Sequence, residues 1–294
     1  MMIRVLGLAV LVNIAYCGHD INPDFMNFLK THLSAAEVRG IVRDELTTGS
    51  FGGGKYNGNV RPVILVHGLN NQAGSLWSIR KTFIENGFPS QRIFATTWGR
   101  GVEQMNLNVK LECEYVNRIR KFIQIVRWYT RAEQVDIIGY SMGSPLVRKA
   151  ILGGKCVDNQ AFELGKPITS QIRTFVSVAG ANQGSHLCLF PFYDICNPIN
   201  GLNCVSKFLQ DINSKEKYEA SYKSYNIAST NDMVVGYWAC GKQASSFAGA
   251  KEWKVENLNH EQTEYDTGKI QLNLIRQGGP LATRRRRRSH VKKH

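Results

Sequence analysis

Five residues near the middle of the chain have the form of a serine nucleophile motif. The letters GYSMG at 139–143 follow the mostly apolar run 135–138 and lead into a helix-like segment, 145–152. A serine on a tight turn between a strand and a helix has its hydroxyl exposed, where a base can take its proton. Glycines two positions to either side leave room for that strained turn. The pattern therefore predicts that Ser141 is a nucleophile.

Two later residues supply the partners that such a serine needs. Asp232 comes shortly after the strand-like segment 225–228, and His260 follows the strand-like segment 253–258. A hydrolytic serine needs a histidine base, and that histidine needs a carboxylate to fix its tautomer. The chain order serine, aspartate, histidine is that of α/β-hydrolases. We therefore expect Ser141, Asp232 and His260 to form a catalytic triad.

Two of these roles have competing candidates. His67 and His186 compete for the role of the base, although His67 lies in a strand-end motif where a structural hydrogen bond is the expected role. Asp194 and Asp211 compete for the role of the acid, since Asp232 could instead cap a turn.

Two backbone amides are candidates for an oxyanion hole, the pair of N–H donors that stabilises charge developing on the substrate oxygen. Met142 directly follows the nucleophile, at the positive end of the expected helix. Leu69 lies in the loop after the first apolar strand, where Gly68 lets the backbone approach a substrate closely. We expect the amides of Leu69 and Met142 to fill this role.

These residues need a scaffold that brings strand ends together, and the hydrophobic pattern predicts one. Strand-like and helix-like segments alternate about six times, without an internal repeat. This is typical of one α/β domain with a mainly parallel sheet of about six strands flanked by helices. In such sheets ligands bind beyond the carboxyl ends of the strands, where the candidate residues lie. The expected strands are 62–66, 92–97, 135–138, 172–178, 225–228 and 253–258, and the expected helices are 75–86, 116–126, 145–152 and 261–276.

The two ends of the chain differ from this domain. The first residues have a positive start, a short apolar run and small residues before Gly18, which predicts a secretory signal peptide and a secreted, extracellular protein. An uncleaved anchor or a buried first helix is the alternative. No later stretch is apolar enough to be transmembrane. The expected division is a signal peptide (1–17), an N-terminal helical extension (18–58), an α/β-hydrolase domain (59–280) and a basic disordered tail (281–294).

The number of cysteines is consistent with a secreted protein. Six of the 7 cysteines lie after residue 17, and an even number in an exported chain indicates disulfides. Their pairing stays open, although Cys188, Cys196 and Cys204 are close enough in sequence for a local bond. Cys113 and Cys156 are alternatively buried thiols. Because no CxxC spacing occurs, no metal site is expected.

Composition and charge narrow the function classes further. Hydrophobic content of 43% and charged content of 20% are globular values, which exclude wholesale disorder. The formal net charge is +14, and half of it comes from the arginines and lysines within 284–293. Such a block is a solvated tail that can contact anionic surfaces or polyanions, or can lack one defined partner. A signal peptide argues against a nuclear role, so no nucleic-acid partner is expected.

Five motifs together resemble the class 2 lipase family. The similarity runs from about residue 60 to 276, and the motifs keep that family's order and rough spacing. It implies an α/β-hydrolase that acts on carboxylic esters of lipids without a metal or other cofactor. It assigns the nucleophile to Ser141, the acid to Asp232, the base to His260 and the oxyanion donors to Leu69 and Met142. The motifs are PVILVHGLN (62–70), VDIIGYSMG (135–143), VAGAN (178–182), STNDMV (229–234) and LNH (258–260).

Some features depart from that family. The nucleophile motif has Gly139-Tyr140 where small bacterial members carry Ala-His, and the segment 183–222 is longer and has its own cysteines. Within it, the apolar stretch 187–193 could form a lid, a rim for an acyl chain, or ordinary core.

The function expected from the sequence is that of a secreted lipase or esterase. It would hydrolyse carboxylic ester bonds of lipids, of the triacylglycerol type, through an acyl-enzyme and at a lipid–water interface. A phospholipase or another ester hydrolase of the same mechanism is the first alternative. The second is a hydrolase-fold protein that binds lipid or polyanions without catalysis.

Overall fold

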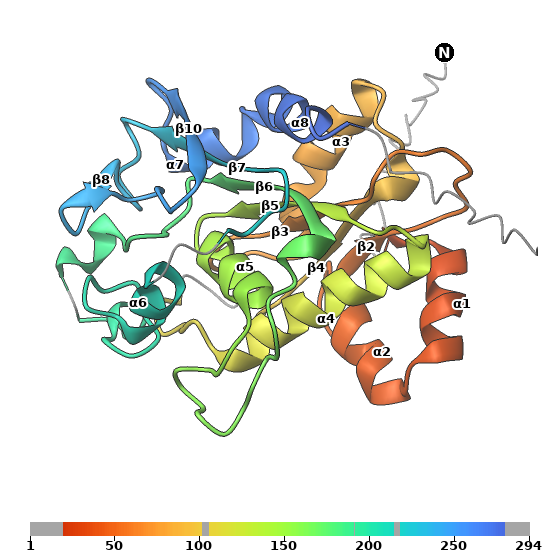
Figure 1. The fold of residues 1–294 in the computed structure, drawn as a ribbon, viewed down its shortest axis with the longest axis horizontal. Helices are drawn as coiled ribbons and strands as arrows, with labels where there is room; N and C mark the ends of the chain where they lie inside the picture. The colour runs from red at the N-terminus through yellow and green to blue at the C-terminus, as the bar shows by residue number, and fades with distance from the viewer. Residues whose placement is uncertain (1–19, 102–105, 191, 215–217, 280–294) are drawn as a thin grey trace, which may run out of the picture.

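The computed structural model describes residues 20–101, 106–190, 192–214 and 218–279, and its centre is an eight-stranded sheet (Figure 1). The expected signal peptide and basic tail lie outside the described residues. The strands follow the order β1-β2-β4-β3-β5-β6-β7-β10, and neighbours are parallel except for β2 with β4. Their bounds are β1 (Asp20–Ile21), β2 (Ser50–Gly52), β3 (Val63–Val66), β4 (Ile93–Thr96), β5 (Val135–Tyr140), β6 (Ile172–Val178), β7 (Lys223–Ser229) and β10 (Ala250–Val255).

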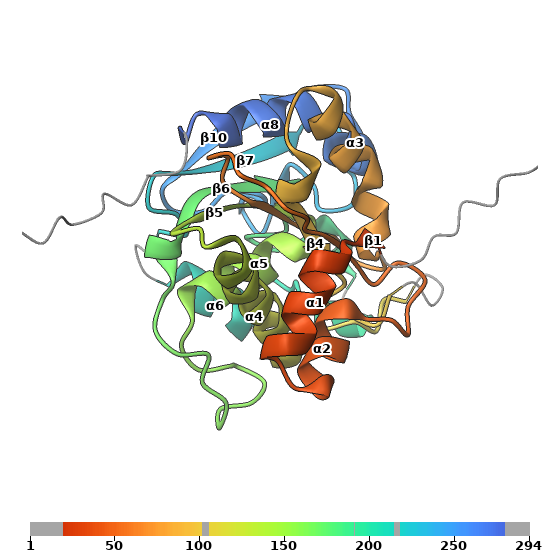
Figure 2. The same ribbon diagram turned by 90° about the vertical axis from the view of Figure 1, so that its right-hand side faces the viewer.

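Helices cover both faces of this sheet, so its central strands are buried throughout. Helices α3 and α8 pack on one face, and α4 and α5 pack on the other (Figures 1 and 2). Successive side chains of a strand point to opposite faces. Accordingly, Leu65 and Ile138 join the apolar cluster under α3 and α8, whereas Ile64 and Ile137 join the cluster under α4 and α5.

The remaining elements surround this core. The helices are α1 (Pro23–His32), α2 (Ala35–Val42), α3 (Trp77–Glu85), α4 (Cys113–Thr130), α5 (Gly143–Leu152), α6 (Lys207–Asn213), α7 (His260–Tyr265) and α8 (Gly268–Arg276). Short 3-10 helices are η1 (Ala73–Leu76), η2 (Ser90–Arg92), η3 (Thr169–Gln171), η4 (His186–Leu189) and η5 (Asp194–Cys196), and β8 (Trp238–Ala239) pairs with β9 (Lys242–Gln243) in a separate hairpin. None of the described helices has the length and apolar composition needed to cross a bilayer.

The predicted α/β class with a mainly parallel sheet is confirmed, but the number of strands is corrected. The sheet has eight strands instead of about six. The two additional strands, β1 and β2, belong to the segment expected to be a helical extension, which therefore carries α1, α2 and one edge of the sheet. The last residue of β2 is a glycine because the strand packs tightly on β4. Gly52 has a φ of +127°, and a Cβ added there would lie 2.6 Å from the Phe94 side chain.

The last predicted helix is also corrected. The expected single helix over 261–276 is two helices, α7 and α8, which are separated at residues 266–267. Helix α8 begins at Gly268, where an added Cβ would lie 3.1 Å from Thr82 of α3. This close packing holds α8 against α3, while α7 lies beside the strand ends.

The cysteines form disulfides, so the buried-thiol alternative is wrong. One bond is local, as the spacing indicated, and another joins the cysteine-rich segment to the β8–β9 hairpin. The bonds are Cys113–Cys156, Cys188–Cys196 and Cys204–Cys240.

Removing the Cys113–Cys156 bond should destabilise the protein more than removing the Cys188–Cys196 bond. Their sequence separations are 43 and 8 residues, and a longer closed loop removes more entropy from the unfolded chain. Replacing both cysteines of each pair by alanine should lower the free energy of unfolding by about 4 and about 2.5 kcal/mol respectively. Denaturant unfolding would measure this, and a larger loss for the short loop would contradict it.

Candidate active site

The nucleophile motif forms a tight turn between β5 and α5. Ser141 has a φ of 47°, in the left-handed region that non-glycine residues rarely adopt. Hydrogen bonds hold this turn: the Ser141 N–H donates to the Val178 carbonyl at 2.9 Å, and the Ser144 N–H donates to the Ser141 carbonyl at 3.1 Å. The backbone conformation is therefore the strained turn that the sequence pattern predicts.

The glycines of the motif are required by close approaches of the backbone. A Cβ added to Gly143 would lie 2.2 Å from the carbonyl oxygen of His67, and one added to Gly139 would lie 3.0 Å from the Cα of Ser144. In the facing loop, a Cβ on Gly68 would lie 3.0 Å from the Cβ of Ser141. The nucleophile turn and the loop after β3 are thus packed against each other without room for side chains.

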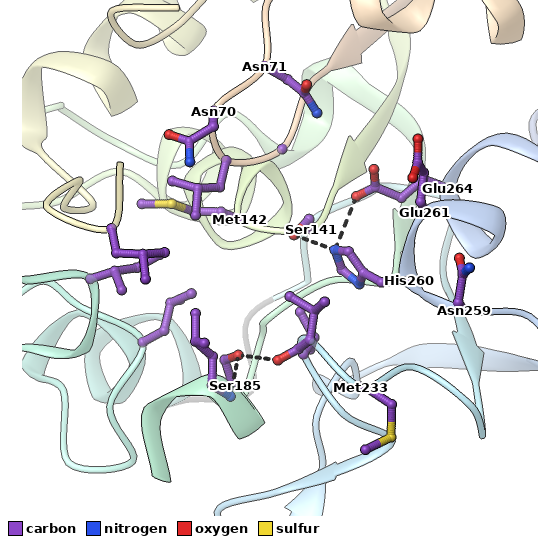
Figure 3. A pocket seen from close by; sticks show the side chains of 18 of the residues that line it. Asn70, Asn71, Ser141, Met142, Ser185, Met233, Asn259, His260, Glu261 and Glu264 are labelled. Atoms are coloured by element: carbon purple, nitrogen blue, oxygen red, sulfur yellow. Dashed lines mark hydrogen bonds and ion pairs between the residues drawn. The ribbon is translucent and has the colours of Figure 1, made fainter. Parts of the chain in front are cut away.

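The structure brings the three predicted triad residues together in the expected order. The Nε2 atom of His260 lies 3.0 Å from the Oγ atom of Ser141, and its Nδ1 atom lies 2.7 Å from the Oδ2 atom of Asp232. The contact between His260 and Ser141 is drawn in Figure 3. The other carboxylate oxygen of Asp232 accepts hydrogen bonds from the N–H groups of Val234 and Val235 at 2.9 and 3.0 Å. These bonds fix the carboxylate that orients the imidazole.

Local sequence explains why His260 stands at the start of α7. Asn259 is the N-cap of that helix, and its side chain accepts from the Gln262 N–H, while the Gln262 side chain accepts from the Asn259 N–H. This capping box fixes the chain entering the helix. The first helical side chain then faces the turn at Ser141.

The electrostatic surroundings suit the roles of an acid and a base. Burial alone would raise the pKa of Asp232, but the hydrogen bond and charge of His260 and two backbone N–H groups lower it below its ordinary value. Burial alone would lower the pKa of His260, but the hydrogen bond to Asp232 and the charge of Glu264 raise it above its ordinary value. Asp232 is therefore ionised at neutral pH, and it stabilises the protonated form of the imidazole.

The two candidate oxyanion donors lie at the same cavity as Ser141. Leu69 and Met142 both line it, one from the loop after β3 and the other from the turn before α5. Gly68 permits the loop that carries Leu69 to lie against the nucleophile. The use of these two backbone amides as oxyanion donors stays a prediction.

His67 has a structural role, as expected. Its ring is buried and stacks on Trp98 with 4.9 Å between the ring centroids. The Nδ1 atom lies 2.8 Å from the Gly68 carbonyl oxygen, and Nε2 accepts a hydrogen bond from the Trp98 N–H at 3.2 Å. Burial lowers the pKa of His67 to about 3, so the ring is neutral. It holds the loop that carries Leu69.

The remaining competitors for the roles of acid and base lie in different surroundings. Asp194 forms an ion pair with Lys110 at 3.1 Å, and Asp211 forms one with Lys149 at 2.5 Å. His186 is exposed on η4. The geometry thus favours His260 and Asp232 over these three residues.

A cavity of about 760 Å³ opens at the carboxyl ends of the strands, beside Ser141 and His260. Its size is within the range of small-molecule sites. The apolar side chains that line it are Leu69, Leu107, Met142, Leu187, Ile195, Leu202, Met233, Val234 and Val235. The cavity can therefore hold an apolar group next to the serine hydroxyl.

One residue of this site was not found from the sequence. Glu264 lies one turn after His260 on α7, is buried and lines the cavity. Its Oε1 atom lies 3.6 Å from the Nε2 atom of His260 (Figure 3). Its position in the predicted helix 261–276, four residues after the candidate base, was the available signal.

The described residues hold one group that could in principle bind a metal: Cys113, Cys156 and Asp158. Because the two cysteines are joined in a disulfide, they offer no thiolate ligands. This group therefore does not fit a metal site.

The fold and this arrangement of residues define the class of protein. A mainly parallel sheet flanked by helices, with a serine on the turn after one strand and a histidine and an aspartate after later strands, is the α/β-hydrolase fold. The model of the family Lipase (class 2) matches residues 60–273, more than half of the chain. The chain belongs to the class 2 lipase family, as its motifs indicated, and it is a hydrolase of the lipase type.

Solved structures agree with this fold. The mature form of the Bacillus licheniformis lipase BlEst2 is 12% identical with a TM-score of 0.53, over 77% of this chain and 97% of that chain. A structure of the metagenome-derived lipolytic enzymes LipS and LipT is 13% identical with a TM-score of 0.51, over 78% and 97%. At such identities the likeness concerns the fold. No curated protein matches this sequence significantly.

Replacing Gly143 by alanine should disrupt the nucleophile turn. The new Cβ would lie 2.2 Å from the carbonyl oxygen of His67, so the turn and the facing loop would have to separate. Reaction with a serine-directed fluorophosphonate should slow at least about tenfold, and the thermal midpoint should fall by several degrees, about 4 °C for each 2 kcal/mol lost.

The matched control is Gly40→Ala on α2, because an added Cβ there meets nothing within 4 Å. That variant should react like the unchanged protein and be as stable or slightly more so. Equal behaviour of the two variants would show that the close approach at Gly143 is unimportant.

Proposed function

We propose that this protein is a secreted lipase or esterase that hydrolyses carboxylic ester bonds of lipids with Ser141, His260 and Asp232 as its catalytic triad. The observation that carries the proposal is the chain of contacts of 3.0 and 2.7 Å from the serine through the histidine to the aspartate. It lies at the wall of a largely apolar cavity. Membership of the class 2 lipase family supports a lipid ester as the substrate.

The reaction follows from this geometry in two halves. Ser141 attacks the ester carbonyl while His260 takes its proton, and the amides of Leu69 and Met142 stabilise the oxyanion. The alcohol leaves with the proton from His260, and Ser141 keeps the acyl group. Water, activated by His260, then attacks the acyl-enzyme and releases the acid.

The residues that line the cavity favour a neutral ester over a phospholipid. Of the described lining residues, Glu261 and Glu264 are acidic and none is a lysine or an arginine. A phosphate group would be repelled by these carboxylates and would find no cation there. The apolar lining suits the acyl chain of an uncharged, acylglycerol-type ester.

Exposed apolar side chains in two segments that contribute residues to the cavity lining, 187–192 and 233–234, support action at a lipid surface. We call Leu189, Phe190, Phe192, Met233 and Val234 the apolar rim. Phe192 is 85% exposed and Met233 is 75% exposed, which excludes the core alternative for this part of 187–193. Met233 and Val234 also line the cavity. Such a patch at the mouth of a site marks an interaction surface.

Secretion remains part of the proposal. Three disulfides are compatible with an extracellular protein. The predicted signal peptide supports export, and the basic tail would add contacts to anionic surfaces.

The direct test is reaction with an active-site fluorophosphonate, located by mass spectrometry, beside turnover of p-nitrophenyl esters of short and long chains. The adduct should lie on Ser141, and Ser141→Ala should lose both labelling and turnover while keeping its thermal midpoint. Full turnover by a clean preparation of Ser141→Ala would overturn the proposal. Failure to label a folded protein would favour a lipid-binding protein without catalysis.

Asp232 can be tested against its rival Asp194. Asp232→Asn should lower kcat by about 10³–10⁴-fold, because the imidazole would lose the carboxylate that fixes its tautomer. Asp194→Asn is the matched control, since Asp194 is half-exposed and pairs with Lys110, and its kcat should stay near that of the unchanged protein. A similar loss in both variants would contradict the assignment.

The apolar rim can be tested with Phe190→Ser/Phe192→Ser. Binding to emulsified long-chain triacylglycerol should weaken about tenfold or more, since each exposed ring loses roughly 1.5–3 kcal/mol of burial in lipid. Hydrolysis of a soluble short-chain ester should change little. The control is Phe162→Ser, also an exposed aromatic side chain. It lies in the connection from α5 to β6, away from the strand ends that carry the triad. Equal losses in both proteins would exclude the rim as a lipid-binding surface.

A further inference from the structure

We propose that Glu264 is a second carboxylate of the active site, which stabilises the protonated form of His260 and so sets the acid limit of activity. The proposal rests on the function proposed above. Glu264 acts through His260, so its role is that of a positioning residue with an electrostatic effect.

The first support is the position of its carboxylate. The Oε1 atom of Glu264 lies 3.6 Å from the Nε2 atom of His260, the same nitrogen that lies 3.0 Å from the Oγ atom of Ser141. Figure 3 shows the imidazole with both neighbours on this side. Asp232 occupies the other nitrogen. The base therefore lies between two carboxylates, one at each nitrogen.

The second support is the lack of a hydrogen-bond donor for this oxygen. The Glu264 side chain is only 5% exposed, and its Oε1 atom has no hydrogen-bond partner among the described residues. A buried acceptor without a donor costs free energy. When His260 takes the proton of Ser141, the positive imidazolium lies at ion-pair distance from this oxygen, 3.6 Å. The carboxylate thus has a cationic neighbour in the state that forms during catalysis.

The third support is the rigid attachment of Glu264. Its backbone carbonyl accepts a hydrogen bond of 2.8 Å from the Gln271 side chain, whose oxygen accepts one of 2.6 Å from the Tyr140 hydroxyl. A Cβ on Gly68 would lie 3.4 Å from Oε1, so the loop after β3 closes the other side. The helical turn that carries Glu264 is therefore held in place, and the loop after β3 borders its carboxylate.

The groups that face Glu264 decide how it titrates. They are His260, Glu261 and Tyr265 on α7, Asp232 after β7, and Tyr140 on β5. Burial raises the pKa of Glu264 to about 7, the charge of His260 lowers it, and those of Asp232 and Glu261 raise it. Burial also raises the pKa of Tyr265 to about 12 and that of Tyr140 well above its ordinary value, so both phenols are neutral.

The sign of the effect follows from these charges. His260 must be neutral to accept the proton of Ser141, so activity rises with pH through the pKa of the base. An ionised Glu264 favours the imidazolium and raises that pKa. It therefore moves the acid limb of the pH profile to higher pH. Once the base is neutral, the same charge stabilises the imidazolium that forms in the transition state. Glu264 thus lowers the activity at acidic pH and raises the reaction rate above neutral pH.

The test is the pH profile of kcat/KM in Glu264→Gln, which has nearly the same shape without the charge, and in Glu264→Met, which also has no hydrogen-bonding group. In both, the acid limb should shift to lower pH by about one unit. The rate above the limb should fall, by at most about tenfold. The matched control is Glu261→Gln, which removes an exposed charge from the same helix. Solvent screens that charge, so its shift should be smaller.

A second readout does not depend on turnover. The NMR titration of the His260 imidazole in Ser141→Ala should move to lower pH when Glu264→Gln is added. If neither the acid limb nor this titration moves, or if Glu261→Gln moves them equally, the proposal is overturned. If the protein hydrolyses no ester, the proposed function fails, and the titration alone still decides whether Glu264 acts on His260.

Discussion

The site depends on the close approach of two backbone segments, the turn after β5 and the loop after β3. Gly143 and Gly68 leave no room for a side chain between them. This contact does two things at once. It holds Ser141 in its strained conformation, and it brings the residues Leu69 and Met142 to one cavity. The buried ring of His67, stacked on Trp98, supports the loop from behind.

The register of the parallel sheet places Asp232 and His260 relative to Ser141, which the contact between the two backbone segments does not do. In its register Tyr140 pairs with Val178, Val178 pairs with Ile227, and Ser229 pairs with Val255. The strands β5, β7 and β10 therefore end at one edge. The serine follows directly on β5, the aspartate follows shortly after β7, and the histidine opens the helix after β10. Residues far apart in the chain meet because the strands before them end at the same level.

This arrangement explains which features could be predicted from the sequence. Ser141, Asp232 and His260 each follow a strand-like segment, so local pattern and chain order were enough to propose them. The strand β2 was missed because it is short and ends in Gly52, which is determined by packing on β4, a contact distant in sequence. The disulfide pairing depends on distances between segments in the folded chain, and the spacing of the cysteines in the sequence does not give these distances. Glu264 was missed because its burial also depends on segments distant in sequence. From the sequence alone, an acid four positions after His260 on a helix is as well suited to a solvent-exposed face.

The two carboxylates beside His260 have different surroundings, and this difference assigns their roles. Asp232 accepts hydrogen bonds from two neighbouring backbone N–H groups as well as from the imidazole, which keeps it ionised. The buried Oε1 of Glu264 has no such donor in the part of the chain that the structure describes, and burial raises the pKa of Glu264. Two acids of similar chemistry thus titrate in separate ranges because of their environments. Asp232, whose pKa is lowered, is ionised near neutral pH, whereas the pKa of Glu264, raised to about 7, makes its charge change near neutral pH. With Asp232 as its sole carboxylate neighbour, His260 would not have its protonation linked to that of a second acid.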